Sequence, residues 1–148
     1  MAEHLAYSLA EHPAPHRERV GLAALFFGLF AAPIMWAGNF MVDYGLASYA
    51  CYPGDHPLSE PQPGLAFVYW LTLAFYVLTL GVCAGAFAIS HRNWRMTGSE
   101  VEGHHHQLME KGEGRTRYLG IIGTAFAVIF FIATLAGLLI YFFEPLCT

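Results

Sequence analysis

Apolar residues gather in three long runs that polar segments separate. The runs cover about 20–46, 65–90 and 118–143, the first being most apolar over 20–42, and none contains Lys or Arg. An α-helix rises about 1.5 Å per residue, so about 20 apolar residues cross the roughly 30 Å hydrocarbon core of a bilayer. The pattern therefore predicts an all-α integral membrane protein, a bundle of three helices.

The polar segments predict how the spans are connected. Residues 1–19 form an N-terminal arm, in which 3–9 is expected to make an interfacial turn of helix, and residues 20–148 form the membrane domain. Four prolines in the loop 51–64 favour an extended, stiff connection over a helix. The loop 91–117 mixes glycine with charge and is expected to be a solvated connector.

Charge gives the spans a direction. The chain of 148 residues is 56% hydrophobic and 12% charged, too apolar for a soluble domain of this size. Its seven Lys and Arg residues all precede the first run or lie between the second and third. Because cytoplasmic loops retain such residues, we expect a cytoplasmic N-terminus and loop 91–117, and an external C-terminus. A cleaved signal peptide is the alternative for the first run, but its polar leader and apolar stretch exceed the usual lengths.

Two cysteines lie at the predicted outer ends of the spans. Cys51 follows the first run and Cys147 the third, on the side where an oxidising environment permits disulfides. We predict a bond between them, with free or metal-binding thiols as the alternative. Cys83 lies in the middle of the second run, where we expect it to be a small apolar packing residue.

Polar residues inside a span are candidates for function. Asn39 and Asp43 share one helix face, with Trp36 a turn before them. Counting about twenty residues from the start of the span places Asp43 in the headgroup region, so we expect it to contact the proline-rich loop or a neighbouring subunit. A proton relay is the alternative. Gly81 and Gly85 have the spacing of a helix-packing motif and complete the predicted partner-contact residues.

Histidine placement argues against a haem protein. None of the eight histidines lies in a predicted span, whereas a b-type haem within the bundle needs two on facing helices. His104, His105 and His106, together with His91, could bind a divalent metal, but a histidine tract in a polar loop is weak evidence for that. The chain has no nucleophile with a base and no phosphate-binding loop, so we expect no enzymatic activity, cofactor or nucleic-acid partner.

The segment 32–40, continuing to Tyr44 and Cys51, and the closing Pro145-Leu146-Cys147 resemble a family of small three-helix bacterial inner-membrane proteins. Members of that family are often encoded beside cytochrome c oxidase genes. The resemblance implies an accessory subunit or assembly factor of a respiratory oxidase or supercomplex. Asn39 stands where the family often has a histidine, which removes the one candidate haem or metal ligand.

These observations leave three functional hypotheses, because fold alone does not determine function. The first is a non-catalytic accessory or assembly subunit of a larger respiratory membrane complex, packed against lipid and other subunits that include haem-containing ones. The second is a small oligomeric transporter or channel that uses the Asn39 and Asp43 face. The third is a copper-handling assembly factor with Cys51 and Cys147 as outward ligands.

Overall fold

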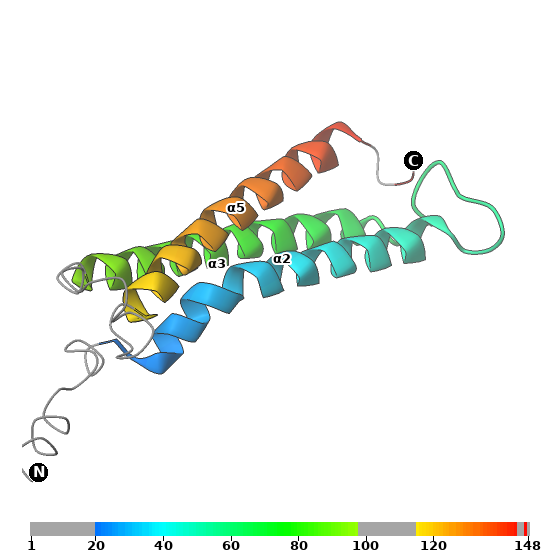
Figure 1. The fold of residues 1–148 in the computed structure, drawn as a ribbon. Coiled ribbons are helices and arrows are strands. Elements are labelled where there is room, and N and C mark those ends of the chain that lie inside the picture. The colour runs from blue at the N-terminus through cyan, green and yellow to red at the C-terminus, as the bar shows by residue number, and fades with distance from the viewer. Residues whose placement is uncertain (1–19, 98–114, 145–146, 148) are drawn as a thin grey trace, which may run out of the picture.

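The computed structural model describes residues 20–97, 115–144 and 147 (Figure 1). Helix α2 covers Leu22–Cys51, α3 covers Phe67–Met96 and α5 covers Arg115–Phe143. All three are long and apolar enough to cross a membrane. The predicted all-α, three-span membrane fold is confirmed. The arm 1–19, most of the loop 91–117 and the histidine triplet 104–106 lie outside the described residues.

The three helices alternate in direction, and α5 crosses the other two obliquely (Figure 1). One end of the bundle holds the Cys51–Cys147 bond and the loop 52–66, and we call it the disulfide end. The opposite end holds Arg92 and Arg95 of α3 and Arg117 of α5, and we call it the arginine end.

Small residues form the middle of the bundle. Ala32, Cys83, Ala86 and Ala127 are fully buried against one another. Towards the arginine end the backbones approach most closely, because a Cβ atom on Gly123 would lie 3.0 Å from the Gly28 carbonyl oxygen and 2.6 Å from Ser90 Oγ. Lipid tails are as apolar as leucine, so membrane helices gain their contact energy from this kind of close approach.

The helices continue beyond the runs that hydropathy marks. Helix α2 ends five residues after the expected limit of 46, and α3 ends six residues after the expected limit of 90. The loop supports the extension of α2, because the Gln62 side chain donates to the Tyr49 carbonyl at 3.0 Å and the Gln62 backbone N–H donates to the Ala50 carbonyl at 3.1 Å. These bonds satisfy carbonyls that a helix end otherwise leaves without a partner.

Threonines within the spans satisfy their hydroxyls locally. Thr79, Thr124 and Thr134 each donate to the carbonyl four residues earlier in their own helix, at 2.7–2.8 Å. A membrane interior offers no water to hydrogen-bond these groups, so a bond within the helix is the simplest solution.

Candidate functional site

The disulfide end is fixed by a covalent bond. Cys51 and Cys147 are joined across 96 positions of sequence, with Cα atoms 5.3 Å apart, and they pack with Ala50 and Val68. This bond confirms the predicted pairing. Copper is bound by thiolates, and in this form neither sulfur is one. Cys83 is a buried free thiol in the small-residue core, in keeping with its expected packing role.

A second feature lies inside the bundle, in the half nearer the disulfide. It comprises five polar side chains from all three helices, which we call the aspartate–tyrosine cluster: Asn39, Asp43, Thr72, Tyr76 and Tyr141. Asn39 and Asp43 are four residues apart on α2, and Thr72 and Tyr76 are four apart on α3, so each pair shares a helix face. The two faces meet where α2 and α3 run side by side.

Tyr76 is the centre of this cluster. Its hydroxyl donates a hydrogen bond to Asp43 Oδ2 at 3.2 Å and lies beside Asn39. The Tyr76 ring is only 7% exposed, and it fits there because the facing residue of α5 is Gly137, where a Cβ would lie 3.2 Å from the ring. A glycine on α5 therefore makes room for the tyrosine that joins α3 to α2.

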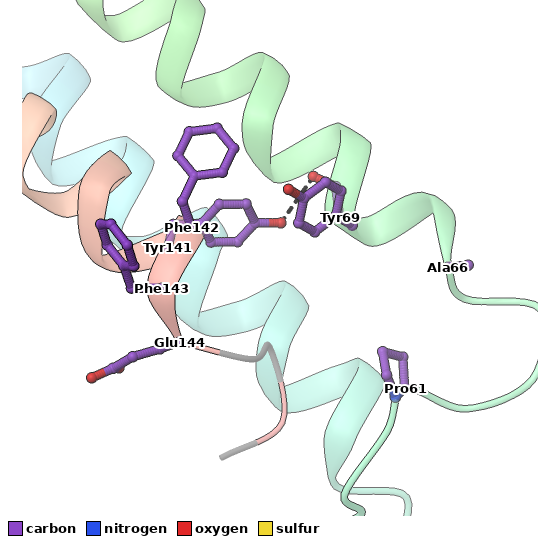
Figure 2. A pocket seen from close by; sticks show the side chains of 7 residues that line it. All are labelled: Pro61, Ala66, Tyr69, Tyr141, Phe142, Phe143 and Glu144. Carbon is purple, nitrogen blue, oxygen red and sulfur yellow. Dashed lines mark hydrogen bonds between the residues drawn. The ribbon is translucent and has the colours of Figure 1, made fainter.

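Tyr141 connects the cluster to α5. Its ring centroid lies 5.8 Å from that of Tyr76 and 5.1 Å from that of Tyr69, on which it stacks. Its hydroxyl donates to the Tyr69 backbone carbonyl at 2.9 Å, and Figure 2 shows this bond spanning α5 and α3. The aromatic pair thereby adds a second polar link between helices.

Two oxygens of the cluster make no hydrogen bond within the described part of the chain. Asn39 Oδ1 and Thr72 Oγ1 are both buried without a well-formed hydrogen bond, although Asn39 lies beside the Tyr76 hydroxyl and Thr72 beside the Tyr141 hydroxyl. Thr72 thus differs from Thr79, Thr124 and Thr134, whose hydroxyls bond to their own helices. An unmade hydrogen bond is costly in an apolar interior, so these two oxygens are the least satisfied polar atoms of the cluster.

Asp43 has a partner that we did not expect. Helix α2 continues for eight residues beyond it, about 12 Å at the usual helical rise. Its partner is Tyr76 of the same chain, and the proline-rich loop does not supply one. Sequence reasoning missed Tyr76, although Thr72 and Tyr76 form a polar pair in the second span with the same spacing as Asn39 and Asp43.

The predicted partner-contact residues do not form one surface. Asn39 and Asp43 face the bundle interior, whereas Trp36 is 37% exposed and packs on Phe130 of α5, with ring centroids 5.4 Å apart. Gly81 and Gly85 lie elsewhere, on α3, and no described atom of another helix lies within 4 Å of a Cβ built on either. The internal helix crossings use other glycines.

A pocket of about 390 Å³ opens beside the cluster at the disulfide end (Figure 2). Its lining combines the aromatic pair with the loop and the end of α5: Pro61, Ala66, Tyr69, Tyr141, Phe142, Phe143 and Glu144. Glu144 is exposed at the rim. Within the described residues, no group of three His, Cys, Asp or Glu side chains is placed to hold a metal ion.

Comparisons with protein-family models, with curated proteins and with solved structures gave no match. The class of the protein is defined by its fold and its site alone: it is a small three-span membrane protein with a disulfide across one end.

Proposed function

We propose that this protein is a non-catalytic accessory or assembly subunit of a larger respiratory membrane complex, cytochrome c oxidase or a supercomplex, in the bacterial inner membrane. The observation that carries the proposal is an open glycine strip on α3, made of Gly81, Ala84, Gly85 and Ala88. The respiratory assignment rests on the resemblance of the segment 32–40 and of the two bonded cysteines.

The strip is open, unlike the glycines that lie at the crossings between helices. A Cβ on Gly120, Gly123 or Gly137 would lie within 3.2 Å of a neighbouring helix, whereas a Cβ on Gly81 or Gly85 would have no described atom of another helix within 4 Å. Ala84 and Ala88 are also exposed, and the spacing places all four on one face. Small residues at this spacing allow another helix to approach closely, which bulky lipid-facing side chains prevent.

The remaining exposed surface supports a role in packing. Large apolar side chains cover α2 and α5, including Phe40 and Met41 on the former and Ile129 and Ile132 on the latter. Asp43, the acidic group within the described helices, is bonded to Tyr76 inside the bundle. A subunit that binds through its spans needs this surface and no catalytic group.

The proposal includes an orientation, with the N-terminus and the arginine end cytoplasmic. Arg92, Arg95 and Arg117 lie together at that end, whereas Asp55, Glu60 and Glu144 lie at the disulfide end. Cytoplasmic retention of basic residues and disulfide formation outside both support this direction. Alkaline phosphatase fused after Thr148 should be active, and the same enzyme fused within the loop 98–114 should be inactive. The reverse result would refute the orientation.

The experiment that tests the function is purification of the tagged protein from native membranes in a mild detergent. We expect haem-containing subunits to co-purify, visible in the absorption spectrum and identified by mass spectrometry of the accompanying chains. Recovery as a haem-free homo-oligomer would refute the proposal.

A second candidate function is a small carrier, favoured by the unpartnered Asn39 Oδ1 beside a carboxylate that lies inside the bundle. Polar groups of this kind in membrane spans mark ion and proton paths. An Asp43→Asn variant should then abolish flux in proteoliposomes. Unchanged flux would refute the carrier function, and the accessory role would be the remaining proposal.

A further inference from the structure

We propose that the α3–α5 face at the arginine end binds one anionic phospholipid, with an acyl chain in an apolar groove and the phosphate on Arg92 and Arg95. This site is separate from the aspartate–tyrosine cluster and from the disulfide end. The lipid does not depend on the proposed partner complex for its contacts, although its groove shares Ala84 with the glycine strip.

The acyl groove exists because its floor is made of small residues. Cys83 and Ala127 are fully buried, and Phe87 and Phe131 rise beside them with 40% and 37% of their surface exposed. The groove has a volume of about 260 Å³ and an almost wholly apolar lining: Cys83, Ala84, Phe87, Ala127, Val128 and Phe131. Its shape and chemistry suit a hydrocarbon chain lying along two helices.

A basic pocket follows the groove towards the helix end. This pocket has a volume of about 360 Å³ and is lined by His91, Arg92, Arg95 and Met96. The Phe87 ring, which lines the groove, stacks on the His91 ring with centroids 5.5 Å apart and planes 7° apart. The apolar and the basic surfaces are therefore continuous through these two rings.

The distance along α3 from the groove to the arginines matches the thickness of one leaflet of a bilayer. From Cys83 to Arg95 the helix rises about 18 Å, and half of the hydrocarbon core is about 15 Å thick. An acyl chain in the groove therefore brings its phosphate to the level of the arginines.

Charge selects an anionic headgroup. Both arginines are exposed, and the described carboxylates lie in the other half of the bundle or beyond it: Asp43, Asp55, Glu60 and Glu144. Arginine binds phosphate oxygens through a planar fork of N–H donors. His91 Nδ1 is buried and has no hydrogen-bond partner in the described part of the chain, so it provides a further polar atom at the same pocket. Basic pockets at span ends are typical sites for anionic lipid headgroups.

Native mass spectrometry of the delipidated full-length protein, titrated with phosphatidylglycerol or phosphatidylcholine, tests this site. We expect one phosphatidylglycerol to be retained in preference to phosphatidylcholine. Arg95→Gln should weaken its binding about fivefold, the effect of about one interfacial basic residue. Arg117→Gln removes the same charge from the same end without touching the pocket, and should leave binding unchanged. Equal retention of the two lipids, or equal weakening by both variants, would overturn the proposal.

The groove has its own matched pair of variants. Val128→Trp fills the groove from α5, whereas Ile132→Trp adds the same bulk at a position 60% exposed that does not line it. We expect only Val128→Trp to lower phosphatidylglycerol retention. Retention unchanged by Val128→Trp, or loss of a co-purifying protein chain in place of the lipid, would overturn the assignment of the groove to an acyl chain.

Discussion

The Tyr76 hydroxyl donates a hydrogen bond to Asp43 Oδ2 at 3.2 Å, and this bond joins α3 to α2 inside the bundle. Tyr76→Phe leaves the carboxylate without this donor while keeping the ring. We expect the free energy of unfolding in detergent micelles to fall by about 1–2 kcal/mol, the upper range for polar contacts between membrane helices. Tyr44→Phe is the matched control, because Tyr44 is 71% exposed and should give no change.

A double-mutant cycle shows whether the fall in the free energy of unfolding comes from the hydrogen bond between Tyr76 and Asp43. Asp43→Ala combined with Tyr76→Phe should cost less than the sum of the two single variants, since both remove the same interaction. Additive effects would mean that the two residues stabilise the bundle independently.

Alanine substitutions at two glycines should change the stability of the bundle in different ways, because one glycine lies at the closest helix crossing and the other does not. Gly123→Ala places a methyl group 2.6 Å from Ser90 Oγ and 3.0 Å from the Gly28 carbonyl, so α2 and α5 must separate. We expect a loss of about 1–3 kcal/mol in thermal or denaturant unfolding, the usual cost of overpacking. Gly81→Ala meets no described atom within 4 Å and should leave stability unchanged or raise it through helix propensity. A destabilised Gly81→Ala variant with an unaffected Gly123→Ala would contradict the packing described for α3 and α5.

The cysteines can be counted by labelling. Maleimide should not react with the native protein, because Cys51 and Cys147 are bonded and Cys83 is buried. Denaturation should expose one thiol, and denaturation with reductant should expose three. A Cys51→Ser/Cys147→Ser double variant should lose about 4–5 kcal/mol of stability on the chain-entropy model, because the bond closes a very long loop. Labelling of three thiols without reductant would show that the bond is absent.

Gln62 gives a prediction about the loop. Gln62→Ala removes the side-chain bond to the Tyr49 carbonyl and should lower stability by about 1 kcal/mol, the net value of a typical hydrogen bond. The backbone bond to the Ala50 carbonyl remains in this variant. Glu60→Ala, two residues earlier and exposed, is the control. Hydrogen exchange at the last turn of α2 should report the same difference between the two variants.

The three spans and the disulfide could be predicted because each follows from a property of the chain alone. Run length identifies the spans, and the positions of Cys51 and Cys147 after two of them imply a common side. The end of α2 could not be predicted this way, since hydropathy does not report the carbonyls that Gln62 satisfies. Helix α2 therefore continues past the expected limit of 46 to Cys51.

The helix faces were the least predictable feature. The spans are apolar all round, so the pattern does not show which side of α3 meets α2. The Gly81 and Gly85 spacing resembles a packing motif, yet the internal crossing uses Gly28 and Gly123. Tyr76 was overlooked for the same reason, because its contact with Asp43 depends on how the two helices are rotated.

The open glycine strip is proposed to bind a helix of a partner complex. The size of the assembly that contains this protein, measured by native electrophoresis, tests this most directly. Membranes holding the wild type, Gly81→Leu/Gly85→Leu or Gly38→Leu/Gly45→Leu would be solubilised in digitonin and separated by native electrophoresis. Gly38 and Gly45 of α2 also meet no described atom within 4 Å, so their variant adds equal bulk elsewhere. We predict that the wild type and the α2 variant migrate in a large assembly, and that Gly81→Leu/Gly85→Leu migrates as a small, folded protein. Retention of Gly81→Leu/Gly85→Leu in the large assembly would contradict the account.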